Sequence, residues 1–163
     1  MTNKNKIIVF IFTLVAAFLL LSNVLAQTGS SNLEKLYGSW NVVVMTVNQP
    51  AADGSHKFPA LITFGDEGNV IADEPPSLGE TSGHGNWISN DDGTVSYTFV
   101  ALFSDGKGTF AGKLKVVGNL QYDSASDTWK GPFKIDAFDT GGKVVGGDTG
   151  TFDMARLAVE TLD

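Results

Sequence analysis

The chain has 163 residues, with 18 acidic residues against 11 basic ones and a formal net charge of −7. This balance argues against nucleic acids and anionic membrane surfaces as partners, because both are bound through clustered lysines and arginines. The absence of cysteine excludes disulfides, thiol catalysis, iron–sulfur clusters and cysteine-ligated zinc.

The first 26 residues have the features of a secretory signal peptide. Lys4 and Lys6 precede an apolar run over residues 7–21, and residues 24–26 form a small-residue cleavage site. We therefore expect cleavage after Ala26, with an uncleaved anchor as the alternative. The mature chain, residues 27–163, is expected to be secreted or periplasmic and no longer attached to a membrane. Cleavage removes two lysines, which leaves nine basic residues against 18 acidic ones and a net charge of −9.

The mature chain is predicted to form one all-β domain. Ser31 and Glu34 fit a helix capping box, so a short helical turn is expected before the first strand. After it, aspartate–glycine turn signals separate runs rich in β-branched and aromatic residues, which is typical of antiparallel strands joined by short turns. Strands are expected over residues 39–47, 58–64, 69–72, 84–90, 94–103, 109–122, 127–138, 142–146 and 149–159.

Residues 72–83 form the longest break between the expected strands. Pro75 and Pro76 have no backbone N–H to donate to a sheet, so strand pairing should stop there. This segment is interpreted as an ordinary surface connection, with a flexible lid as the alternative.

Apolar and polar residues alternate along the later strands. Val95, Tyr97 and Phe99 share one face of their strand, and the same alternation recurs over residues 110–120 and 129–137. Such alternation indicates one buried face and one face in water. A closed up-and-down barrel of eight or nine strands buries the apolar face and removes the sheet edges. A sandwich of two sheets is the competing arrangement.

Gly38, Ser39 and Trp40 open the first expected strand and resemble the Gly-x-Trp signature of lipocalins and other calycins. The resemblance implies a barrel whose closed end holds the tryptophan, covered by a basic residue near the last strand. Arg156, the only arginine in the sequence, lies in the final apolar run. A guanidinium can stack on an indole face and donate to nearby carbonyls. Gly38, Trp40 and Arg156 are therefore expected to be structural residues.

The lipocalin-like reading implies an exported barrel that binds or carries a small hydrophobic molecule. Apolar cavities with few polar groups suit such ligands. No cofactor and no metal are expected, because the two histidines lie 28 positions apart and the acidic turns lack the ligand run of a calcium loop. The oligomeric state stays open. The residues expected to line the interior and contact the ligand are Val42, Val44, Tyr97, Phe99, Phe110, Leu114 and Phe133.

Two alternatives remain open. The first is a filled barrel that serves as a structural or interaction domain, with contacts made by residues 72–83. The second is a cyclase or isomerase on a barrel that resembles the allene oxide cyclases, with His84, Asn86 and Tyr97 as candidate residues. His84 stands between two glycines at a strand start, where it could transfer protons, contact a ligand or be a plain strand-edge residue. His56 is expected on the surface, and no nucleophile elbow is present.

Overall fold

The computed structural model describes residues 33–48, 54, 56–75 and 79–162. Residues from Leu36 onward form one compact unit, which contains all the strands. The expected signal peptide and Ser31 of the capping box lie outside the described residues. The described part of the expected helical segment is a single helical residue, Leu33, followed by a turn up to Leu36.

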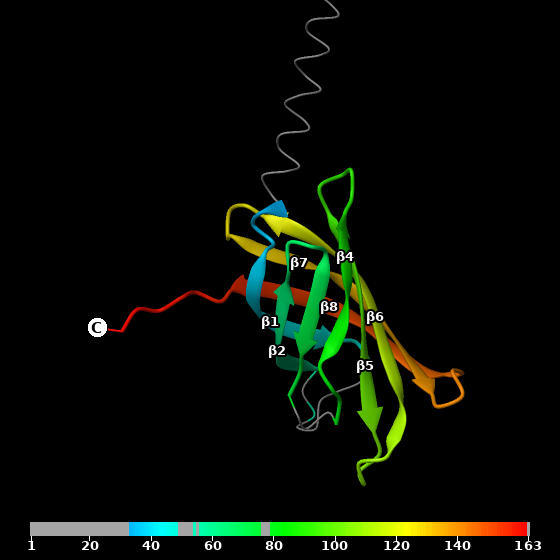
Figure 1. Ribbon diagram of the computed structural model, residues 1–163. Coiled ribbons are helices and arrows are strands. Elements are labelled where there is room, and N and C mark those ends of the chain that lie inside the picture. The colour runs from blue at the N-terminus through cyan, green and yellow to red at the C-terminus, as the bar shows by residue number, and fades with distance from the viewer. Residues whose placement is uncertain (1–32, 49–53, 55, 76–78, 163) are drawn as a thin grey trace, which may run out of the picture. The chain divides into compact units, whose positions relative to one another are not determined.

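Eight antiparallel strands form a closed barrel (Figure 1). Each strand pairs with its neighbours in chain order, and the last strand pairs with the first. This confirms the up-and-down barrel and rules out the two-sheet sandwich. The strands are β1 (Gly38–Thr46), β2 (Lys57–Phe64), β3 (Asn69–Asp73), β4 (Gly83–Ser89), β5 (Val95–Ser104), β6 (Phe110–Asp123), β7 (Thr128–Asp139) and β8 (Val144–Arg156).

The two strands expected over residues 142–146 and 149–159 are one continuous strand, β8. These strands left a break at residues 147–148, but Gly147 and Asp148 pair with Asp136 and Ile135 of β7. Pairing runs from Val144 to Ala155 and is irregular only near Ala137 of β7. The long partner strand therefore holds β8 in the sheet where its local sequence favours a turn.

Trp40 and Arg156 close one end of the barrel. The indole is fully buried, and its Nε1 donates to the carbonyl of Leu36 at 2.8 Å. The Arg156 guanidinium lies 4.4 Å from the centroid of the indole ring, and its Nη1 donates to the Tyr37 carbonyl at 2.9 Å. Gly38 has φ +112°, a conformation that favours glycine, and the same guanidinium lies close above it. These contacts bind the segment before β1 to the end of β8.

Aromatic rings fill the middle of the barrel. Tyr97 stacks on Phe152 with ring centroids 5.9 Å apart, and Phe152 contacts Phe133 at 4.5 Å. The Tyr97 ring fits because residue 118 on the paired strand is glycine: a Cβ there would overlap the phenol. This aromatic layer separates the Trp40 end of the barrel from the opposite end.

Replacing Trp40 with alanine should destabilise the protein by about 3–5 kcal/mol, because a fully buried indole and its hydrogen bond are lost. The free energy of unfolding in denaturant measures the effect. Ile88→Ala is the control, because Ile88 is an exposed strand residue and should cost less than about 1 kcal/mol. Equal costs for the two variants would show that Trp40 does not close the barrel.

Gly118→Ala should destabilise the protein by about 1–3 kcal/mol, because the new methyl group overpacks the core. It would overlap the Tyr97 ring and would lie 2.8 Å from the backbone oxygen of Pro132, which cannot rotate away. Gly106→Ala is the matched control, because nothing lies within 4 Å of its Cβ position. Thermal unfolding of both variants should show a loss for Gly118→Ala alone.

Candidate functional site

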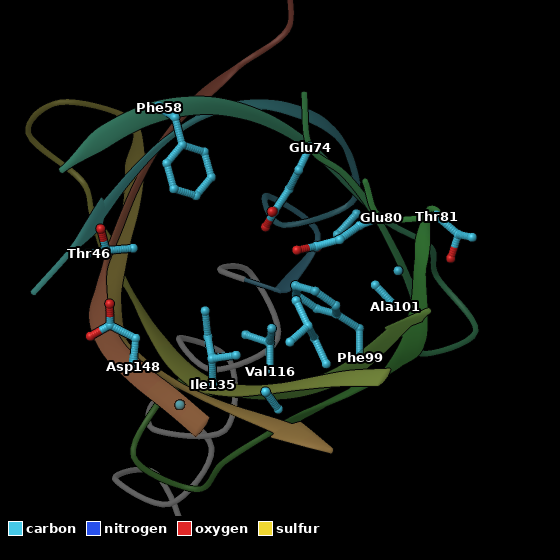
Figure 2. Close-up of a pocket in the computed structure, with 15 residues that line it drawn as sticks. Thr46, Phe58, Glu74, Glu80, Thr81, Phe99, Ala101, Val116, Ile135 and Asp148 are labelled. Atoms are coloured by element: carbon cyan, nitrogen blue, oxygen red, sulfur yellow. The ribbon is translucent and has the colours of Figure 1, made fainter. Parts of the chain in front are cut away.

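A cavity of about 120 Å³ opens into the barrel at the end opposite Trp40 (Figure 2). Thr46, the last residue of β1, lines it, whereas Trp40 lies near the start of the same strand. Each of the eight strands contributes at least one residue to the lining. The lining residues are Thr46, Phe58, Ala72, Glu74, Glu80, Thr81, Gly83, Phe99, Ala101, Leu114, Val116, Ile135, Ala137, Gly147 and Asp148.

The lining combines apolar walls with negative charge. Eight of its residues are apolar, and three carry carboxylates: Glu74, Glu80 and Asp148. No lysine, arginine or histidine is among the described residues that line it. The cavity therefore offers hydrophobic contact and a negative potential, with no basic group to offset the charge.

Glu74 and Glu80 come from the connection between β3 and β4. Glu74 directly follows the last residue of β3, while Glu80 forms a bridge with Phe103 of β5. Next to it, the backbone N–H of Thr81 donates to the Leu102 carbonyl at 2.8 Å, which anchors this part of the connection on β5. Figure 2 shows both glutamate side chains reaching into the cavity with their carboxylates toward one another.

Partial burial disfavours the ionised form of both glutamates. Desolvation raises the pKa of Glu74 above its usual value. Desolvation, and then the charge of Glu74, raises the pKa of Glu80 to about 7. Neither carboxylate accepts a hydrogen bond from a residue within the described ranges. Among the described residues, the two carboxylates therefore have no hydrogen-bond partner.

Asp148 has a structural role on the opposite wall of the cavity. Its side chain is 6% exposed, and its Oδ1 accepts hydrogen bonds from the backbone N–H of Asn48 at 3.1 Å and of Thr149 at 2.7 Å. The Asn48 amide Nδ2 adds a third bond at 3.0 Å. This carboxylate therefore fastens the chain after β1 to β8 mainly through Oδ1, while Oδ2 shares the Asn48 N–H at 3.2 Å.

The structure brings two of the expected wall residues, Phe99 and Leu114, to the cavity. The other inward-facing ones belong to the packed core and do not line it. They are Val42, Val44, Tyr97 and Phe133. The aromatic layer fills the middle of the barrel, so only the residues beyond it face open space.

Phe110 does not face the interior, contrary to expectation; it is 53% exposed. A bulge near the β5–β6 turn causes the difference. Phe103 pairs with Gly112 but Ser104 pairs with Phe110, which leaves Ala111 without a partner. One extra residue reverses the alternation of faces, so Phe110 lies on the outside. Gly112, next to the bulge, is the local signal for it, because a glycine inside a strand often marks a bulge.

The three residues of the enzyme alternative are not brought together. His84 and Asn86 are exposed on β4, whereas Gly83 and Trp87 of the same strand are buried. Tyr97 is inside the barrel, its hydroxyl has no hydrogen-bond partner among the described residues, and burial raises its pKa. A phenol that stays protonated cannot serve as a base. His56 is exposed, as expected.

Sequence reasoning missed Glu74 and Glu80, which it placed in a surface connection. The only signal in the sequence was that these two acidic residues lie on either side of Pro75 and Pro76. Their burial depends on the anchoring of residues 79–81 to β5, which the local pattern does not reveal.

Comparison with protein-family models, with curated proteins and with solved structures finds no match for this chain. Within the described ranges, no group of three or more potential ligand side chains could hold a metal ion. No helix in the described part of the chain is long and apolar enough to cross a membrane.

The raised pKa of Glu80 predicts a pH-dependent stability. The folded state keeps a proton up to about pH 7 that the unfolded chain releases near its usual pKa of 4.5, so the free energy of unfolding falls as the pH rises between these values. After allowance for solvent screening, we expect about 1–2 kcal/mol from this group. Denaturation of Glu80→Gln between about pH 5 and pH 8 should reduce this slope to what Glu74 contributes. Glu67→Gln, in the exposed turn after β2, should retain it.

Proposed function

We propose that this protein is an exported, lipocalin-like barrel that binds a small, largely apolar molecule in the cavity at its open end. The observation that carries the proposal is the cavity itself, with its eight apolar lining residues. The closed eight-stranded barrel and the contact of Arg156 with Trp40 support the lipocalin-like assignment. The cavity favours a binding role over a filled barrel that acts only through its surface.

The size of the cavity limits what can enter. Its volume of about 120 Å³ is close to that of an engineered apolar cavity of roughly 150 Å³ that binds benzene. Sites for drug-sized molecules occupy roughly 300–1,000 Å³. The ligand, or the part of it that enters the barrel, is therefore about as large as one aromatic ring.

Export is part of the proposal and has its own test. The apolar run over residues 7–21 and the small residues before Gln27 support removal of the first 26 residues. The protein should be purified from the exported fraction of its host. Its N-terminal sequence should begin at Gln27, and its mass should match residues 27–163. A full-length, membrane-attached chain would contradict this.

A proton-transfer enzyme, such as an isomerase or cyclase, is the second candidate. The observation in its favour is Glu80, since a half-buried carboxyl with a pKa of about 7 suits general acid–base catalysis. An enzyme would convert a bound compound, and Glu80→Gln would reduce turnover by about a hundredfold or more. Recovery of an unchanged ligand after extraction from the native protein would favour the binding role.

Ala101→Phe should abolish binding of a ring-sized probe, because the new ring occupies the cavity that Ala101 lines. Toluene is a suitable probe, and its binding can be followed by NMR shifts of the lining methyl groups. Leu102→Phe is the matched control, because the neighbouring Leu102 is 47% exposed on the outer face. The proposal fails if the wild-type protein binds no ring-sized compound, or if a folded Ala101→Phe variant binds toluene as the wild type does.

A further inference from the structure

We propose that the cavity selects a cationic ligand: a primary ammonium group on a small apolar body, held between the carboxylates of Glu74 and Glu80. The inference rests on the proposed function, because it names the class of molecule that the same cavity binds. It is carried by the charge of the lining, by the two carboxylates without described partners and by the small volume.

The charge of the lining decides the sign of the ligand. All three charged residues that line the cavity are acidic, and no described lining residue is basic. A fatty acid or another anion would meet only like charges inside an apolar wall, where repulsion is poorly screened. A neutral ligand would leave the two glutamates unpaired. A cation would meet opposite charge on entry.

An ammonium group can donate hydrogen bonds to both glutamates at once. It offers three N–H donors, and carboxylates that face one another can each accept at least one of them. Such charge-assisted bonds are about twice as strong as neutral ones. Asp148 is less available to the ligand, because its Oδ1 accepts from Asn48 and Thr149 and its Oδ2 shares the Asn48 N–H.

A metal ion does not suit this pair. Calcium takes six to eight oxygen ligands and magnesium six. Glu74 and Glu80 stand beside the side chains of Phe99 and Ala101, and no group of three potential ligands is found in the described part of the chain. An organic cation needs fewer oxygens and places its apolar body against the walls.

Binding of the cation should be linked to proton release. With the pKa of Glu80 raised to about 7, the empty pair holds a proton below neutral pH. The ammonium takes the place of that proton, which passes to the buffer. The titratable groups that face Glu80 are Glu74, which follows β3, and Asp148 on β8; the described lining residues of the other strands do not titrate. Affinity for the cation should therefore rise with pH through about 7.

The test compares three probes of one shape and different charge: 2-phenylethylamine, 2-phenylethanol and 3-phenylpropionate. Each is titrated calorimetrically into the purified protein at about pH 8 and about pH 5.5. We expect the amine to bind about tenfold or more tightly than the alcohol at the higher pH, and the anion to bind weakest. The preference for the amine should shrink at the lower pH. Titration at about pH 5.5 in two buffers of different ionisation enthalpy should show close to one proton released with the amine and none with the alcohol, whereas at about pH 8 the release should be small.

Variants locate the preference. Glu80→Gln and Glu74→Gln should each reduce the amine-to-alcohol affinity ratio about fivefold or more, whereas Glu67→Gln should retain it. If the alcohol binds and the amine has no advantage at the higher pH, the cationic ligand class is wrong and the proposed binding function stands. If none of the three probes binds, both proposals are overturned. The pH series on the wild-type protein decides the question even if a variant fails to fold.

Discussion

The whole structure depends on the pairing of β1 with β8. β1 pairs with β2 along one edge and with β8 along the other, and residues 40–46 face residues 156–150 in an unbroken register. Without this ladder the sheet would have two free edges, and its apolar face would lie open to water. There is no cysteine to staple the barrel. The Trp40–Arg156 contact therefore stands where the ladder begins and holds the two ends of the sheet together.

This closure also determines where a ligand can bind. Trp40 and Leu36 are fully buried at the closed end, and the stacked rings of Tyr97 and Phe152 fill the middle. Only the far end is left, where smaller side chains such as Ala72 and Ala101 line open space. The site is small because the aromatic layer takes up most of the interior. It is acidic because two glutamates between β3 and β4, Glu74 and Glu80, point their side chains into it.

The regular parts of this fold could be predicted from the alternation of apolar and polar residues. Tyr97, Phe99 and Val116 are buried as expected, because period-two patterning depends only on the pleat of a strand. Local patterning failed where distant pairing overrides it. Phe110 turns outward because a bulge inserts Ala111, and β8 continues through Gly146 and Gly147 because β7 holds it. The glutamate pair could not be predicted, since burial of a loop side chain depends on the strand against which the loop lies.

The long reach of the closing ladder has a consequence for the order of folding. The contact of Arg156 with the Tyr37 carbonyl joins groups 119 residues apart, whereas the other seven strand pairs of the barrel all join consecutive strands. Such distant contacts are costly in chain entropy and form late. Hairpins from β2 to β7 can form as the chain emerges, but the barrel cannot close until its last strand is present. A nascent chain that lacks residues 150–156 therefore has no closed form, and its sheet keeps two free edges until they are made.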